Sequence, residues 1–176
     1  MAAFFLLKTE DGSMPHLKLM KLLYLSDREC FEKHGFSMSG DRMVSMPHGP
    51  VLSDTLNLMS GEQKSASGGW NSVISGIENH TVSLVDSDLT DDDLGELSRA
   101  DREVMDSVWK KFGSMNRWQI RDYTHTLPEY EDPRGSSVPI DFDTLFSALG
   151  FSKKQAEYLK EQFDKDRAIE KYFSRR

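Results

Sequence analysis

The segment that most constrains the fold is residues 15–33, a helical stretch that is apolar around most of its circumference. At 100° per residue, its leucine, methionine, tyrosine, cysteine and phenylalanine side chains fill nearly the whole helical wheel. They leave one narrow stripe that includes Lys21 and Arg28, and Gly35 ends the helix. A helix with so little polar surface must be covered by its neighbours, so the segment predicts the buried centre of a helical domain.

Capping residues, glycines and prolines divide the rest of the chain into shorter elements. Apolar spacing predicts further helices at residues 3–8, 51–59 (from near Ser53 or Asp54), 98–112, 114–125 and 141–149, and from residue 152 onward. Residues 40–50 predict an extended or turn-rich loop, and residues 61–69 a flexible link. Two β-branched runs around an Asn-containing turn predict a hairpin. The predicted fold class is therefore mainly α: a single compact helical domain over residues 1–176 with one small antiparallel β-hairpin at about residues 70–85.

Charge and cysteine content exclude several classes of protein. The chain has 22 Lys and Arg against 29 Asp and Glu, a net charge of −7, and no long basic run, which argues against a nucleic-acid partner. Cys30 is the only cysteine, so no intrachain disulfide and no cysteine-rich zinc site can form. The apolar run at residues 2–7 is far shorter than the ~18 residues that span a bilayer. We expect a cytoplasmic protein with no cofactor and no membrane association.

Asp27 is the residue of the long helix that most needs an explanation. It falls in the middle of the apolar arc, where a carboxylate without a partner would be costly. We expect a structural acid, held either by backbone N–H groups or by an arginine. The candidate arginines are Arg42, Arg117 and Arg121.

An enzymatic alternative gathers Asp27, His48 and His125 into one acid–base or metal site, because a carboxylate that orients an imidazole is a recurrent catalytic unit. This hypothesis makes the chain a hydrolase or a metal-dependent enzyme. Nothing in the spacing of the three residues requires them to meet. The sequence also lacks the phosphate-loop, nucleophile-elbow and zinc-helix motifs.

Two short proline-containing segments next to predicted helices indicate rigid loops. In the first, His48, Gly49 and Pro50 suit either a plain turn or a binding loop, and Gly49 can adopt a positive φ. The second, residues 127–130, follows the helix that ends near His125. We expect the two loops to pack near one another and to frame one face of the domain.

Five aspartates lie between residues 86 and 93. They lack the glycine and the glutamate that an EF-hand loop requires, so they do not predict a calcium site. The stretch is either a solvated acidic loop or a surface that attracts a basic partner. Trp70 precedes it and suits either the core or, where exposed, an anchor for such a partner.

Three blocks of sequence form an ordered pattern. They are Lys-Leu-Leu-Tyr-Leu-Ser-Asp-Arg at residues 21–28, Gly-Asp at 40–41 with His-Gly-Pro-Val at 48–51, and Thr-His-Thr-Leu-Pro-Glu-Tyr at 124–130 followed by Asp-Pro at 132–133. Over residues 17–140 the chain resembles the Panacea domain, or SocA-like antitoxin, family. The motif residues to which we assign a structural role are Tyr24, Asp27, His48, Gly49, Pro50, His125, Pro128 and Glu129. Tyr130 departs from the pattern, in which a tryptophan commonly follows the Pro-Glu pair.

The resemblance implies a mostly helical antitoxin, not an enzyme, that neutralises a cognate protein toxin by direct binding. Two mechanisms stay open, because the antitoxin can block the toxin or present it to a protease. Family members face unrelated toxins, so we expect the toxin-binding surface outside the motif blocks. The candidate partner-binding residues are Trp70, Asp91, Asp92 and Asp93. No helix-turn-helix extension is evident, so the sequence does not indicate whether the protein represses its own operon. The terminal amphipathic helices can pack on the core or on a second copy, which leaves a homo-oligomer open.

Overall fold

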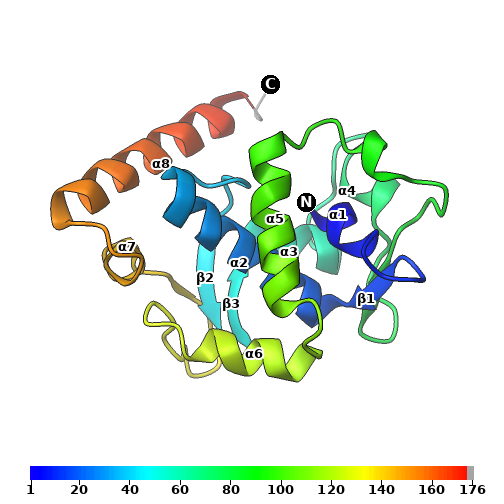
Figure 1. Cartoon of the computed structure of the whole chain (residues 1–176), viewed down its shortest axis with the longest axis horizontal. Coiled ribbons are helices and arrows are strands. Elements are labelled where there is room, and N and C mark those ends of the chain that lie inside the picture. The colour runs from blue at the N-terminus through cyan, green and yellow to red at the C-terminus, as the bar shows by residue number, and fades with distance from the viewer. Residues whose placement is uncertain (174–176) are drawn as a thin grey trace.

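The computed structural model describes residues 1–173, except for the side chains of residues 170, 171 and 173. Its helices are α1 (Ala2–Leu6), α2 (His16–His34), α3 (Ser53–Ser60), α4 (Trp70–Val73), the 3-10 turn η1 (Asp91–Asp93), α5 (Arg99–Phe112), α6 (Arg117–His125), α7 (Phe142–Ala148) and α8 (Lys153–Phe173). The strands are β1 (Ser13–Pro15), β2 (Met43–Met46), β3 (Gly49–Leu52), β4 (Thr81–Ser83) and β5 (Val138–Pro139). The predicted mainly α character is confirmed (Figure 1).

The long helix α2 is the centre of the fold. α5, α6 and β3 all pack against it, and in Figure 1 α5 crosses in front of it while α6 lies below. The helix ends at Gly35, where a φ of 75° gives the left-handed conformation that closes many helices. Even the narrow stripe is largely enclosed, since Lys21 is fully buried. α2 is therefore the buried core helix that its apolar wheel predicts.

Residues 40–50, predicted as an extended or turn-rich loop, are extended around a turn at residues 47–48 but form part of a small sheet rather than a loop. β2 and β3 pair antiparallel, with Met43 opposite Leu52 and Met46 opposite Gly49, and β5 pairs with the other edge of β2. The prolines obscured this sheet in the sequence. Pro50 is tolerated because β3 is an edge strand, where a missing backbone donor does least harm.

The predicted hairpin at residues 70–85 is present in part. Residues 70–73 form the short helix α4, but Ile74 still forms an antiparallel bridge with Leu84 and Glu78 forms one with Thr81. The second arm, β4, also pairs with β1, with Val82 opposite Met14, so the strands are not a single hairpin. The turn itself is present: Asn79 and His80 both have positive φ, and the residues on either side exchange backbone hydrogen bonds. β1 lies far from β4 in the sequence, so local patterns did not reveal the pairing.

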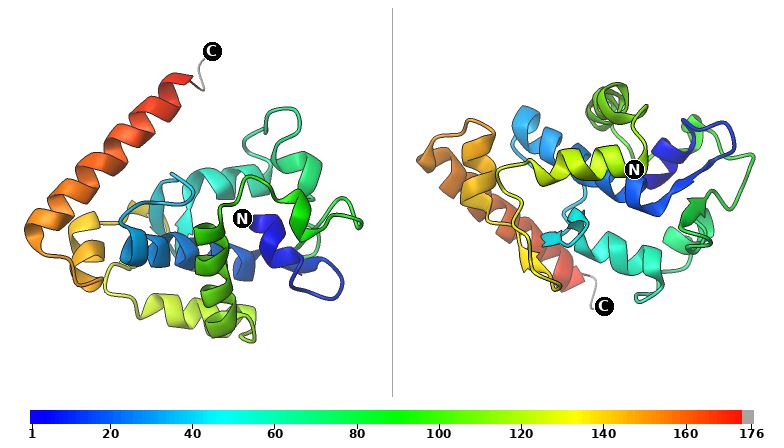
Figure 2. Two further views of the ribbon diagram at one scale, coloured as in Figure 1. Left: turned by 45° about the horizontal axis from the view of Figure 1, so that its top comes forward. Right: turned by 90° about the horizontal axis from the view of Figure 1, so that it is seen from below.

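The helices α7 and α8 form a layer at one end of the molecule (Figure 1). Phe31 of α2 meets Phe142 and Phe146 of α7 and Phe163 of α8, with ring centroids 5.1–6.0 Å apart. Most other side chains of α8 are exposed, but Arg167 lies 3.5 Å from Asp54 of α3, and Figure 2 shows α8 running along one side of the molecule. Among residues 1–173, no helix has the length and apolar character needed to cross a membrane.

Candidate functional site

The first and third motif blocks meet at Glu129, in the loop that follows α6. The side chain of Glu129 is fully buried against α2. Tyr24 donates from its hydroxyl to Oε1 of Glu129 at 2.9 Å, and Nε of Arg28 donates to the same oxygen at 2.7 Å. Burial, reinforced by the Glu129 charge, raises the pKa of Tyr24 well above its ordinary value.

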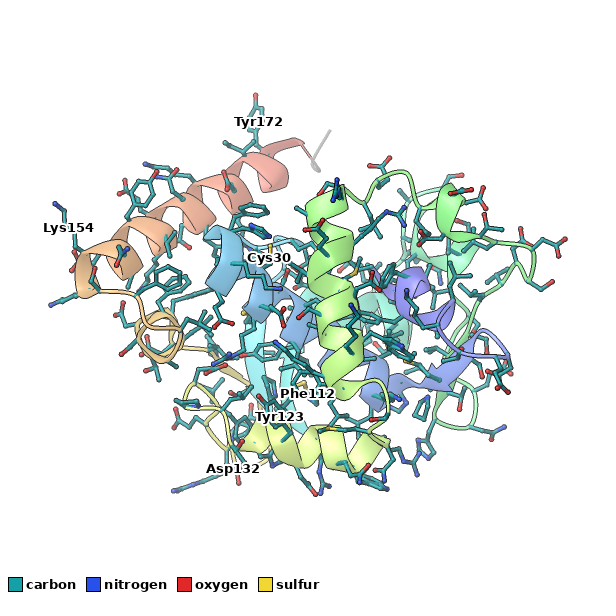
Figure 3. All side chains as sticks on the ribbon, in the orientation of Figure 1. Cys30, Phe112, Tyr123, Asp132, Lys154 and Tyr172 are labelled. Carbon is teal, nitrogen blue, oxygen red and sulfur yellow. The ribbon has the colours of Figure 1, made fainter. Side chains whose placement is uncertain are left out.

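Figure 3 shows the neighbouring α5–α6 contact, where Phe112 and Tyr123 pack with ring centroids 4.8 Å apart.

Lys21, one turn earlier on the same helix, binds the second block. Its Nζ donates to the carbonyl oxygen of Pro50 at 2.7 Å, and burial lowers the pKa of Lys21 to about 7. The adjacent Gly49 has a φ of 91°, and a Cβ there would lie 2.7 Å from Oγ1 of Thr124 and 3.0 Å from Cδ2 of His125. Gly49 therefore allows β3 to approach the C-terminal end of α6, directly before the loop of residues 127–130.

His125 and Tyr130 stack against each other at this junction. Their ring centroids are 4.4 Å apart with an angle of 11° between the planes, and the Tyr130 hydroxyl donates to the backbone oxygen of Met46 at 3.4 Å. Burial lowers the pKa of His125, and the nearby cations Arg121 and Lys21 lower it further. Tyr130 thus keeps an aromatic ring at the position where the family pattern has tryptophan.

Asp27 binds a different segment, residues 37–39. Its Oδ1 accepts the backbone N–H groups of Met38 and Ser39, both at 2.8 Å. Its Oδ2 accepts the hydroxyls of Ser37, at 3.1 Å, and of Ser39. Burial raises the pKa of Asp27 to about 6, against the opposing effect of these hydrogen bonds. Of the two kinds of partner that the sequence left open, this acid uses backbone N–H groups, with two hydroxyls in addition.

The three candidate arginines make other contacts. Arg42 pairs with Asp54 at 2.9 Å, and Arg121 pairs with Asp122. Arg117 lies over the ring of Trp118, 4.8 Å from its centroid. The pairing of Asp27 with an arginine, one of the two expectations, is therefore wrong.

The acid–base site of the enzymatic alternative is not assembled. In the described part of the chain, no hydrogen bond joins Asp27, His48 and His125 to one another. His48 is exposed in the β2–β3 turn, and Nε2 of His125 is buried without a hydrogen-bond partner among residues 1–173. Over the same residues, no group of three His, Cys, Asp or Glu side chains is placed to hold a metal ion.

Asp41, in the second block, has a role that the sequence did not indicate. Its carboxylate accepts the N–H of Asp54 at 2.8 Å and both the N–H and the hydroxyl of Thr55 at 2.7 Å. Leu52, at the N-cap position of α3, has no side chain that can accept a hydrogen bond. Asp41 takes that role and accepts from the first N–H groups of the helix, although it lies well before α3 in the sequence. A capping residue ordinarily sits directly before its helix, so only membership of a motif block could have drawn attention to Asp41.

Of the candidate partner-binding residues, Trp70 lies elsewhere and lines a surface hollow that we call the Trp70 cleft. Its volume is about 370 Å3, and the lining residues used below are Ala3, Leu23, Leu52, Trp70, Val73 and Leu94. Trp70 is half-buried and packs against the core rather than standing out as an anchor. Its Nε1–H is buried and has no hydrogen-bond partner among the described residues.

The three aspartates of η1 lie directly before Leu94. Asp91 pairs with Arg102, which also donates to the carbonyl oxygen of Leu94 at 2.9 Å. Asp93 accepts the N–H and the hydroxyl of Thr90 at 2.8 and 2.7 Å. Asp91 and Asp93 therefore help to hold the segment in shape, whereas Asp92 presents an exposed carboxylate.

The fold and these contacts define a helical protein whose motif side chains tie α2 to the β2–β3 hairpin and to the loop after α6. A family model described as "Antitoxin SocA-like, Panacea domain" matches residues 19–130. The chain therefore belongs to the SocA-like Panacea family, as the sequence blocks indicated. A comparison with curated proteins found no match, and a comparison with solved structures found none either.

Proposed function

We propose that this protein is an antitoxin that neutralises a cognate protein toxin by binding it directly. Membership of the SocA-like family over residues 19–130 carries the proposal. The polar groups of Lys21, Tyr24 and Glu129 are engaged within the fold, which supports a structural role for these motif residues and leaves toxin binding to the rest of the surface. No observation favours the hydrolase or metal-enzyme alternative.

We further propose that the toxin binds outside the motif blocks, at Trp70 and the neighbouring acidic segment. Residues 86–106 hold nine Asp and Glu against two Arg, a net charge of −7 that equals the formal net charge of the whole chain. A surface of this sign attracts a basic partner and speeds the encounter. Asp91, Asp92 and Asp93 belong to this segment, so the proposal favours a toxin with a basic surface.

Binding can neutralise the toxin in two ways, by covering its active surface or by presenting it to a protease. In either case the complex forms in the cytoplasm, where the single buried thiol of Cys30 stays reduced. Growth of a host that lacks the protease distinguishes the two mechanisms. Neutralisation by covering persists in a host that lacks the protease, whereas neutralisation by an adaptor is lost.

The test is to express the product of the short open reading frame beside the gene for this chain, alone and together with the chain. We expect the neighbour alone to stop growth, co-expression to restore it, and the two proteins to co-purify as a stoichiometric complex. A neighbour that is harmless, or a toxic neighbour that this chain neither binds nor neutralises, would contradict the proposal. Repeating the growth assay in protease-deficient hosts separates the two mechanisms.

A further inference from the structure

We propose that the Trp70 cleft receives an apolar side chain of the toxin whose neighbours in the toxin sequence are Lys or Arg. This inference rests on the proposed function and adds to it the chemistry of the toxin segment. It joins an apolar cleft to the acidic segment that contains Leu94, one of the residues lining the cleft. Neither feature alone would identify an occupant.

The floor of the cleft suits an apolar side chain. Leu23 of α2 and Leu52 of β3 lie at its base and are almost fully buried, and α1 contributes Ala3. The small side chain of Ala3 leaves open the space that a larger residue would fill. The volume, about 370 Å3, lies at the lower end of the range of ligand pockets, about 300–1,000 Å3. An apolar anchor in a desolvated pocket is the arrangement that contributes most to protein–protein affinity.

The rim of the cleft selects for positive charge beside that anchor. Leu94 is part of the wall, and the exposed acids Asp92 and Glu96 stand two residues before it and two residues after it. Several other acids of this segment already have internal partners, such as Asp106, which pairs with Lys8 at 2.9 Å. The exposed carboxylates of the rim complement flanking Lys or Arg side chains. An acidic or uncharged segment would gain nothing from them.

The walls of the cleft are held in place before any partner binds. Arg102 binds Asp91 and the carbonyl oxygen of Leu94, and so fixes the η1 wall to the first turn of α5. On the other side, Ser65 donates to Oδ1 of Asn71 at 2.8 Å and closes the link before Trp70. Walls that are already ordered reduce the entropy that binding must remove.

The experiment measures the affinity of the purified chain for the toxin encoded by the neighbouring open reading frame. Ala3→Leu fills the cleft without changing charge, and its matched control Ala168→Leu adds the same side chain at an exposed position on α8. We expect Ala3→Leu to raise Kd at least tenfold and the control to leave it unchanged. Melting curves establish that each variant is folded. If Ala3→Leu does not fold, Val73→Phe narrows the same cleft from its half-buried rim.

The charge variants test the rim. Asp92→Lys with Glu96→Lys should slow association at low salt by about tenfold or more and remove most of its salt dependence. The matched control is Glu157→Lys with Asp164→Lys, which reverses two exposed acids on α8. If the toxin binds wild type and every variant with equal affinity, the cleft proposal is overturned while the proposed function stands. If the toxin does not bind wild type at all, it is the proposed function that fails.

If the toxin does not bind wild type, a basic peptide still tests the cleft proposal. A synthetic peptide, Lys-Arg-Leu-Phe-Arg-Lys, is titrated into the isotope-labelled chain and followed by NMR. We expect shifts confined to the indole N–H of Trp70 and the methyl groups of Leu94 and Val73, absent with Ala3→Leu. The same peptide with Glu in place of each cation should cause none. Absence of shifts with the basic peptide, or equal shifts with both peptides, overturns the proposal.

Discussion

Tyr24 and Glu129 are joined by a hydrogen bond, 2.9 Å long, between residues 105 positions apart in the chain. This contact connects the first motif block to the third, and Arg28 completes the cluster. Within the fold it fixes the loop after α6 onto the central helix. Residues that identify the family are therefore used here to hold the scaffold, which leaves the remaining surface free to suit a particular partner.

Glu129→Ala should lower the free energy of unfolding by about 3–5 kcal/mol, because it leaves Arg28 with a largely buried charge and no counter-ion at this site. Tyr24→Phe should cost only about 1 kcal/mol, since Arg28 still pairs with the carboxylate. Urea denaturation measures both. Glu131→Ala, at an exposed acid in the same loop, is the control and should stay within about 0.5 kcal/mol of wild type. Equal costs for Glu129 and Glu131 would show that the buried cluster does not stabilise the fold.

Asp27→Ala should destabilise the protein strongly, because it strands two backbone N–H groups and two hydroxyls inside the fold. Asp27→Asn should be tolerated, since an amide oxygen can still accept from Met38 and Ser39. The two melting temperatures distinguish these outcomes. An Ala variant that melts like wild type yet fails to neutralise the toxin would show that Asp27 has a functional role instead.

The pH dependence of stability gives a second test of Asp27. Its pKa is raised to about 6, so the folded protein binds this proton more tightly than the unfolded chain does. The Asp27 contribution to the free energy of unfolding is therefore greatest at low pH and falls as pH rises toward 6, by roughly 3 kcal/mol in all. Relative to Asp27→Asn, wild type should lose stability between about pH 4 and 6 and then level off. A difference that stays constant across this range would contradict the assignment.

Local signals predicted the helices well because each carries its own start or stop. The apolar wheel and Gly35 defined α2, and the capping box of Ser98 and Asp101 defined the start of α5. Asp141 likewise caps α7 at its predicted start. Interactions of this kind involve residues within a few positions of one another, so sequence spacing is enough to reveal them.

Several features that sequence reasoning missed depend on distant partners, whereas the local β2–β3 pairing was hidden by its prolines. β4 pairs with β1, and α3 is capped by Asp41, which lies well before the helix in the sequence. The buried charges belong to the same class: Lys21 lies on the narrow stripe of α2, but nothing local says that Pro50 will cover it. The residues of the motif blocks were found as a set through the family resemblance, whereas their contacts required the fold.

Lys21 should make stability depend on pH in the alkaline range. Burial lowers its pKa to about 7, so between pH 7 and 10 the unfolded chain binds this proton while the folded protein largely does not. Raising the pH through that window therefore raises the free energy of unfolding, by up to about 4 kcal/mol from this group. Lys21→Met removes the titrating group. The stability of wild type relative to this variant should rise steadily from pH 7 to 10, and parallel curves for the two proteins would contradict the prediction.

Gly49 should be essential to the junction between β3 and α6, for two separable reasons. Its φ of 91° disfavours any side chain, and a Cβ would lie 2.7 Å from Oγ1 of Thr124. Gly61 is the matched control, because its φ of 79° is also left-handed but no atom lies within 4 Å of a Cβ there. We expect Gly61→Ala to cost about 1 kcal/mol from backbone strain alone, and Gly49→Ala about 3 kcal/mol or more. Denaturant unfolding measures the difference, and equal costs at the two glycines would mean that the close approach of β3 and α6 does not contribute to stability.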